Sequence, residues 1–170
     1  MAVTAPARVG THALRPARTT DIPGIIDLFA EWHWENTCRG LEIPTSEAVR
    51  ERLPLTMVAV DPDGTPIGLI NGRLSTAAED LAAVFPPGSQ VMEIEHLYVA
   101  RGHRNEGVGT ALLQALIARG QETGAAGYWL STAVRDWEHA VRFYQRHGFE
   151  VWAVRMVRPG LAADRAESVK

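Results

Sequence analysis

A strand pattern that leads directly into a glycine-bearing turn and a long helix constrains this chain more than any other feature. Residues 91–99 are rich in strand formers, and residues 104–109 read Arg-Asn-Glu-Gly-Val-Gly. From Val108 onward, apolar residues recur at steps of three and four, which predicts a helix that ends near Gly120 and Gly124. Unpaired amides and the helix dipole point outward from such a turn, so the pattern favours an anionic ligand, most naturally a diphosphate.

Two common nucleotide-binding signatures are missing from this segment. No Gly-Lys-Ser/Thr follows the glycines, as a phosphate loop that binds ATP requires. The three spaced glycines and the downstream acidic residue of dinucleotide-binding folds are also missing. The sequence therefore disfavours both ATP and NAD.

The remaining pattern predicts a mixed α/β domain with helices over a twisted sheet. The length of 170 residues suits one domain, which we place at residues 13–157, between a flexible N-terminus (1–12) and a flexible C-terminal tail (158–170). We expect helices over residues 21–34, 45–53, 108–120 and 137–147, an insertion over residues 75–88, and strands over residues 56–60, 66–72, 91–99, 128–132 and 149–157.

Composition excludes several classes of partner. The formal net charge is −3, so there is no overall positive field for nucleic acid or an anionic membrane. No stretch reaches the ~20 apolar residues of a membrane span, and the single cysteine, Cys38, calls for no oxidising compartment. We expect a soluble, cytoplasmic protein with no nucleic-acid or membrane partner.

Two carboxylates in the strand before the turn are candidates for acid–base chemistry. Regular alternation places four residues on one face of this strand: Glu93, Glu95, Leu97 and Val99. His96 then points to the opposite face, where we expect a structural or exposed side chain. A β-bulge would change which glutamate points inward. Either glutamate could instead only pair with an arginine on a neighbouring strand.

Four segments resemble the GNAT family of N-acetyltransferases. The pattern Arg-x-x-Gly-x-Gly at residues 104–109 resembles its motif A, and the preceding Leu-Tyr-Val at 97–99 is a common family form. Residues 140–149 resemble its motif B, Ala-x-x-Phe-Tyr-x-x-x-Gly-Phe, and residues 14–23 resemble its opening. The resemblance covers residues 13–157 and implies a twisted, mostly antiparallel sheet with a splayed pair of parallel strands, flanked by about four helices.

The resemblance also implies roles for individual residues. Main-chain groups around Leu97 and Val99 would pair with the pantetheine arm of acetyl-CoA, where two central strands splay apart. Tyr144 of motif B would lie near the thioester sulfur and return a proton to the CoA thiolate. Trp137 stands where motif B usually has Asn, so that contact is lost or replaced by Asp136 or by packing. The residues implied to bind pyrophosphate are Arg104, Asn105, Glu106, Gly107, Val108, Gly109 and Thr110.

Acetyl transfer to an amine needs a base, because an alkylamine has a pKa near 10.4 and only the neutral form is nucleophilic. Glu95 stands nine residues before Arg104, the position of the proposed base in polyamine acetyltransferases, which this segment resembles. Glu93 resembles the glutamate position of the histone-acetylating branch. We predict Glu95 as the base and keep Glu93 as the alternative.

The sequence therefore predicts an acetyl-CoA-dependent acyltransferase that acts on a primary amine of a small molecule, without a metal. A protein or peptide N-acetyltransferase and a non-catalytic, CoA-binding regulatory module are the alternatives. The rings of Trp32, His33 and Trp34 are candidates to hold a cationic amine. Alternatively, Trp32 packs in the core and Trp34 lies at a dimer surface. A homodimer is a family-level expectation.

Overall fold

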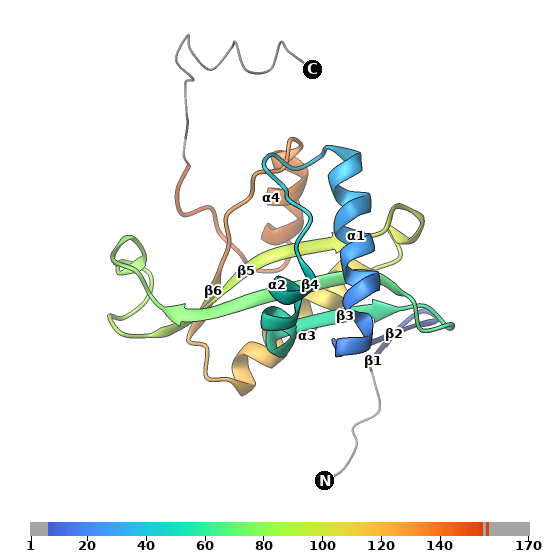
Figure 1. Cartoon of the computed structure of the whole chain (residues 1–170). Coiled ribbons are helices and arrows are strands. Elements are labelled where there is room, and N and C mark those ends of the chain that lie inside the picture. Colours follow the sequence, from blue (N-terminus) through green and yellow to red (C-terminus); the bar gives the residue numbers. More distant parts are fainter. Residues whose placement is uncertain (1–6, 155, 157–170) are drawn as a thin grey trace. The chain divides into compact units, whose positions relative to one another are not determined.

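The computed structural model describes residues 7–154 and residue 156 (Figure 1). The chain divides into two compact units, Met1–Arg135 and Asp136–Lys170. The first unit contains the sheet and the helices that pack on it, and the second contains one described helix. Within the described residues, no helix is long and apolar enough to cross a membrane.

The described part of the first unit forms a six-stranded sheet in the order β1-β2-β3-β4-β5-β6. Neighbouring strands are antiparallel except β5 and β6, which are parallel. The mixed α/β class and the mostly antiparallel sheet are thus confirmed. The strands are β1 (Ala7–Val9), β2 (His12–Pro16), β3 (Thr56–Val60), β4 (Pro66–Thr76), β5 (Gln90–Val99) and β6 (Gly127–Trp129).

Helices cover both faces of this sheet (Figure 1). α1 (Ile22–Glu35) and α2 (Ser46–Arg52) pack on one face, and α3 (Val108–Glu122) packs on the other. α2 begins where the sequence predicts, because the Thr45 side chain accepts a hydrogen bond from the amide of Ala48 and caps the helix. Short 3-10 turns lie at Thr19–Asp21, Leu53–Leu55, Glu79–Leu81 and Arg101–His103.

One part of the core lies between α1 and the sheet because the apolar residues of α1 recur at helical spacing, and buried leucines of α3 pack on the other face. In the part under α1, Ile25, Leu28 and Phe29 are buried with Val58 of β3 and Leu69 of β4. This packing fixes the distance between α1 and the sheet, and both elements contribute walls of the pocket described below.

The parallel strands β5 and β6 separate soon after they pair. Their register ends at Glu93 and Trp129, because the chain beyond β6 turns toward the loop after α1. There Val134 forms a bridge with Cys38, and the amide of Arg39 donates to the carbonyl of Ala133 at 3.1 Å. The splayed parallel pair is therefore confirmed.

The second unit contains α4 (Trp137–Gln145). Asp136 caps this helix, since its side chain accepts a hydrogen bond from the amide of His139 at 3.2 Å. Gly148 has a left-handed φ of 84° after the helix, a backbone conformation that commonly ends a helix at a glycine. The final strand predicted over 149–157 is wrong for residues 149–154, which have no strand pairing; Arg155 and Val157 lie outside the described residues.

The structure differs in part from what we expected for the N-terminal segment and for the insertion. β1 falls within the segment 1–12 that we expected to be flexible, and it pairs with β2 through Val9 and His12. The predicted insertion 75–88 begins inside β4 and continues through the 3-10 turn at Glu79–Leu81. The predicted tail 158–170 lies outside the described residues, and the single-domain boundary stays a prediction.

Candidate active site

The turn after β5 forms the N-terminus of α3. Asn105 and Gly107 adopt left-handed backbone angles, with φ of 64° and 81°. Gly107 is the N-cap residue, and no described side chain caps this end of the helix. First-turn amides have no acceptor within a helix, and the helix dipole adds partial positive charge. With Val108 and Gly109 in its first turn, this end of α3 has the geometry of an anion site.

Arg104, to which the resemblance gives a role in binding pyrophosphate, is paired inside the protein. Its Nη2 atom donates to both carboxylate oxygens of Glu35, at 2.9 and 2.8 Å. Its Nε atom donates to the carbonyl of Val99 at 2.9 Å, and its guanidinium lies 5.3 Å from the ring centroid of Tyr98. Arg104 therefore connects α1 to the end of β5, and its contact with a phosphate stays a prediction.

Glu106 of the same turn lies beside two histidines. Its Oε2 atom is 3.0 Å from Nε2 of His12 and 3.9 Å from Nδ1 of His103, so the three side chains could in principle hold a metal ion. A metal on Nε2 of His12 would leave the proton on Nδ1, and that atom is buried without a partner among the described residues. Histidine ligands normally donate this proton to an acceptor, so we assign no metal to the cluster.

One edge of β5 lacks a neighbouring strand beyond Glu93 within the described residues. Leu97 and Val99 lie on this stretch, where the resemblance places main-chain contacts to pantetheine. The carbonyl of Val99 already accepts the hydrogen bond from Arg104. The open edge is thus compatible with an extended ligand near Leu97, and both contacts stay predictions.

A β-bulge interrupts the pairing of β4 with β5. Asn71 pairs with His96, but the next residue, Gly72, pairs with Ile94. Glu95 is therefore the extra residue of the bulge. A bulge redirects the side chains around it, so this single residue changes which groups of β5 reach each face of the sheet.

The regular alternation that we predicted for β5 is wrong as a result. Glu95 and His96 both lie on the face covered by α1 and α2, since Glu95 contacts α2 and His96 lines a pocket on this face. Val99 and, by alternation, Leu97 lie on the α3 face, where Val99 and a leucine of α3 both approach Gly68. His96 thus shares a face with Glu95 and not with Leu97.

Both glutamates form ion pairs with arginines. Glu93 pairs closely with Arg73 on β4. Glu95 lies between two arginines: its Oε1 is 3.4 Å from Nε of Arg73 and its Oε2 is 3.4 Å from Nε of Arg52. Nδ2 of Asn71 also donates to Oε2 of Glu95, at 3.1 Å. Ion pairing with neighbouring arginines, one of our sequence interpretations, is therefore present for both residues.

His96 is the imidazole nearest to this carboxylate. Its Nδ1 atom lies 3.0 Å from Oδ1 of Asn71, and its ring packs 5.0 Å from that of Phe29 on α1. Burial lowers the pKa of His96; the charge of Glu95 opposes this effect and that of Arg52 adds to it. A lowered pKa keeps the imidazole neutral, and therefore able to accept a proton, at neutral pH.

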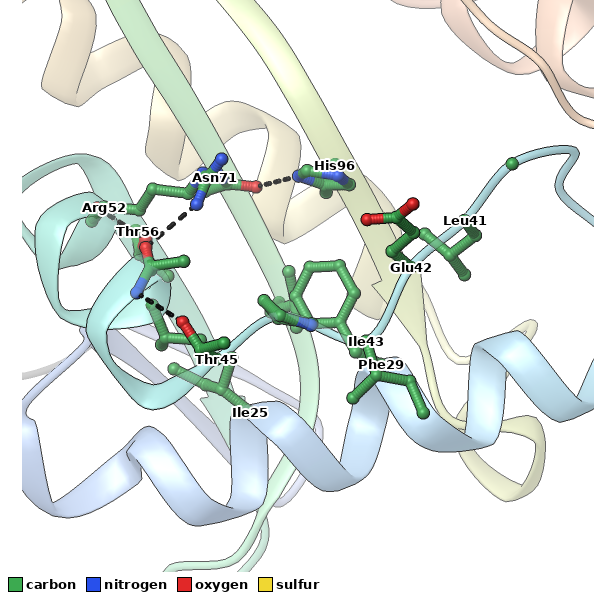
Figure 2. Close-up of a pocket in the computed structure, with 15 residues that line it drawn as sticks. Ile25, Phe29, Leu41, Glu42, Ile43, Thr45, Arg52, Thr56, Asn71 and His96 are labelled. Carbon is green, nitrogen blue, oxygen red and sulfur yellow. Dashed lines mark hydrogen bonds between the residues drawn. The ribbon is translucent and has the colours of Figure 1, made fainter.

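A pocket of about 430 Å³ lies beside these groups (Figure 2). Its walls come from α1, the loop before α2, α2 itself and the middle strands of the sheet. The polar groups that face it include Glu42, Arg52, Asn71 and His96, and Figure 2 shows the Glu42 carboxylate directed toward the side of His96. This volume lies within the range of small-molecule sites.

A family model described as the acetyltransferase (GNAT) family matches residues 26–149. The chain belongs to the GNAT family. The match includes α1 from Ile26 onward, the bulged strand, the α3 turn and α4. The resemblance read from motifs A and B is thereby confirmed.

Individual proteins agree with this assignment. An uncharacterised N-acetyltransferase of Bacillus subtilis, YjcF, is 34% identical over 59 residues, which span 35% of this chain and 39% of that protein. Glucosamine-6-phosphate N-acetyltransferase of Arabidopsis thaliana has the same fold, with a TM-score of 0.65 at 16% identity over 88% of this chain and 99% of that one. An aminoglycoside acetyltransferase from an uncultured soil sample superimposes with a TM-score of 0.66 at 17% identity, over 88% and 96% of the two chains.

The aromatic cluster that we considered for the acceptor site of this GNAT protein does not line the pocket. Trp32 is buried and stacks on Tyr98 with ring centroids 5.2 Å apart, as the alternative interpretation expected. Trp34 is 81% exposed, and its ring meets that of His33 edge to face. The aromatic residue of the pocket is Phe29, one turn earlier in α1.

Tyr144, the motif B tyrosine, lies in the second unit on α4. Burial raises its pKa to about 12, so its phenol stays protonated at neutral pH and can donate a proton. Trp137, which replaces the usual Asn of motif B, is exposed at the start of α4. Asp136 caps the helix, and the role of Tyr144 as a proton donor stays a prediction.

The sequence interpretation missed Asn71, Arg52 and Glu42 as pocket residues and set His96 aside. A usable signal for Asn71 was present, because an amide within the apolar strand pattern 66–72 needs a buried partner. The glycine that follows it is a recognised sign of a bulge. No comparable local signal marks Arg52 or Glu42, which reach the pocket through tertiary packing.

Proposed function

We propose that this chain is an acetyl-CoA-dependent N-acetyltransferase that moves the acetyl group directly to a primary amine of a small molecule. The observation that carries the proposal is the position of two features along one strand. At its end, β5 leads into the uncapped N-terminus of α3, and in its middle it places the Glu95 bulge beside the pocket. Family membership supports this assignment.

The residues present fit acetyl-CoA. The first-turn amides of Val108 and Gly109 suit a diphosphate, because the N-cap residue of α3, Gly107, makes no side-chain cap hydrogen bond. Gly107 supports this fit, since its φ of 81° favours a residue without Cβ. The open edge of β5 near Leu97 suits the amide-bearing pantetheine arm. Acetyl-CoA supplies the acetyl group as a reactive thioester.

Proton removal from the acceptor is proposed to depend on Glu95. Glu95 lies in the bulge beside Asn71 and Arg52, two residues that line the pocket. Glu93 stays the alternative, but it is closely paired with Arg73. An ammonium ion that enters the pocket must lose a proton before its nitrogen attacks the thioester. Tyr144 is proposed to donate a proton to the CoA thiolate.

The pocket favours a small amine over a peptide. The loop 40–45 and α2 close one side of it, whereas a peptide acceptor needs an open groove. The similar folds of an aminoglycoside acetyltransferase and a glucosamine-6-phosphate N-acetyltransferase support small amines as the substrate class. Glu42 adds a negative charge that suits a cationic acceptor.

A thiol-release screen with acetyl-CoA and a library of amines tests this proposal. The library contains aminoglycosides, amino sugars, polyamines, amino acids and lysine-bearing peptides, and each product is checked by mass spectrometry for one added acetyl group. We expect turnover with small amines and little with peptides. Turnover only with peptides would favour the protein-acetylating alternative. Acetyl-CoA binding without turnover of any amine would favour the non-catalytic regulatory module.

A further inference from the structure

His96 is a half-buried titratable group that lines the pocket, and the proposed function gives it no role. We propose that His96 is a catalytic residue that accepts the proton of the acceptor ammonium at its Nε2 atom, and that Glu95 acts on it through Asn71. The inference rests on the proposed function, because it concerns the acceptor amine of that reaction. In this scheme Glu95 is a positioning residue and does not itself contact the acceptor.

Asn71 fixes the donor and acceptor directions of the two hydrogen bonds that connect Glu95 to His96. A carboxylate only accepts hydrogen bonds, so the amide group of Asn71 must present its NH2 to Glu95, at 3.1 Å. The amide oxygen then faces Nδ1 of His96, at 3.0 Å. An amide oxygen also only accepts, so Nδ1 must carry the proton. In the neutral imidazole, the lone pair is therefore on Nε2.

The free nitrogen of His96 is available to a ligand. Nδ1 is occupied by Asn71, and Nε2 has no protein partner among the described residues. His96 lines the pocket together with Asn71 and Arg52. Neither glutamate of β5 is among the residues that line it. Of the two candidate proton acceptors next to the bulge, His96 is thus the one with access to a molecule in the pocket.

The charges around His96 suit proton transfer from a cation. β5 contributes Glu95, β4 contributes Arg73, α2 contributes Arg52 and the loop before α2 contributes Glu42. α1 packs the rings of Phe29 and Trp32 edge to face against the imidazole. The two arginines lie against Glu95, which balances part of their charge, whereas Glu42 is free to attract an ammonium ion toward the side of His96 (Figure 2).

The step balances in protons and bonds. Nε2 takes one proton from the ammonium ion and becomes the second N–H of an imidazolium, which later releases that proton to water. The neutral amine then forms a C–N bond to the acetyl carbon, and the C–S bond breaks. The nitrogen loses a second proton when the amide forms, and the CoA thiolate gains one proton to become the thiol. The number of protons is therefore conserved.

A spectroscopic experiment tests the geometry without any acceptor. The full chain is labelled with ¹⁵N-histidine, and the imidazole nitrogens are followed between pH 5 and 9. We expect His96 to carry its proton on Nδ1 when neutral and to titrate below the usual 6.5. Asn71→Leu should abolish this preference for Nδ1. A proton on Nε2 in the wild-type protein would overturn the inference.

A kinetic experiment then tests the role of Nε2. The substitution His96→Gln supplies an amide that can still donate to Asn71 but removes the basic nitrogen. With the amine of highest wild-type turnover, this variant should lower kcat by about 10²–10³-fold while the acetyl-CoA Kd stays unchanged. The deficit should shrink as pH rises and more amine is neutral. His139→Gln, at an exposed position on α4, is the matched control and should match the wild type.

The outcomes separate this inference from the proposed function. Asn71→Leu and Glu95→Gln should reduce kcat less than His96→Gln, because each disturbs only the orientation of the imidazole. Full activity of His96→Gln together with an inactive Glu95→Gln would assign the base to Glu95 itself and overturn the inference alone. A wild-type chain that acetylates no amine would overturn the proposed function, and the inference with it.

Discussion

Arg104 connects two elements of the first unit, and this gives it a structural role besides the one that the motif implies. It forms a two-pronged ion pair with Glu35, and Tyr98 donates its hydroxyl to the same carboxylate at 3.1 Å. Glu35 is largely shielded, with 12% of its side chain exposed, whereas Arg104 is 38% exposed. Partial exposure weakens such a pair relative to a buried one.

A substitution series separates the two roles of Arg104. Arg104→Ala should lower the free energy of unfolding by about 1–2 kcal/mol, and Glu35→Gln should lower it by a similar amount. The double variant should cost less than the sum of the two, as thermal and chemical unfolding can show. If Arg104→Ala and the double variant raise the acetyl-CoA Kd in calorimetry while Glu35→Gln does not, Arg104 contacts phosphate. Equal Kd values in all three variants would restrict it to the structural role.

Tyr144 allows a paired test of stability and chemistry. Burial raises its pKa to about 12, above the value near 10 of an unfolded chain. The protonated phenol therefore stabilises the fold fully below about pH 10, and this contribution is lost as pH rises toward 12. Tyr144→Phe should remove this pH dependence, which thermal unfolding between pH 8 and 11 can measure.

The same variant reports on catalysis. A thiolate is a good leaving group, so loss of the hydroxyl should slow single-turnover acetyl transfer by a modest factor, about 10–10³. A lower melting temperature with an unchanged chemical rate would mean that Tyr144 only stabilises its helix. The thiolate would then take its proton from water.

The bulge in β5 is the element on which the acceptor side of the site depends. A Cβ atom on Gly72 would lie 2.6 Å from the sulfur of Met92 and 3.0 Å from the carbonyl oxygen of Glu93. Only glycine therefore lets β4 approach β5 at the point where the register shifts. The bulge in turn brings Glu95 and His96 to one face.

Gly72→Ala should disturb this element specifically. Overpacking against a backbone oxygen should lower the free energy of unfolding by about 1–3 kcal/mol, and turnover should fall because Glu95 and His96 move. Gly102→Ala is the control, since a Cβ there meets nothing within 4 Å. Unfolding in urea and the thiol-release assay measure the two effects. An unchanged turnover in Gly72→Ala would show that the bulge geometry does not limit the reaction.

Sequence patterns predicted the elements better than the site. Periodicity and caps located α1, α2 and α3 because these signals are local, as at Thr45 and Gly107. Alternation failed in β5, because one extra residue reverses which side chains share a face beyond it. The strand expected after Phe149 also failed: its apolar pattern is suitable, but a strand forms only where another strand pairs with it.

At the scale of the whole molecule, the family-level expectation is a homodimer. Trp34 is a large apolar side chain with 81% exposure on α1, and it is the residue that our alternative interpretation places at a dimer surface. Light scattering should give twice the chain mass of 18.6 kDa, and Trp34→Lys should shift the protein toward the monomer. A mass of one chain for the wild type at micromolar concentration would contradict this expectation.

Acetyl-CoA binding at the N-terminus of α3 is the claim on which the whole account depends. Two glycines at opposite ends of this helix provide a matched test, because Gly107 and Gly124 share a φ of 81°. A Cβ on Gly124 meets nothing within 4 Å, and one on Gly107 meets only a methyl group of Val9 at 3.5 Å. Alanine at either position should therefore strain the backbone to a similar degree.

Calorimetric titration of acetyl-CoA into the wild type, Gly107→Ala and Gly124→Ala is the most direct measurement. The account predicts that the wild type and Gly124→Ala bind equally, while Gly107→Ala binds at least about tenfold more weakly, or about 1.4 kcal/mol. The methyl group of Gly107→Ala would stand where the diphosphate must approach the backbone. Equal affinity of the two variants, or a wild type that does not bind acetyl-CoA, would contradict the account.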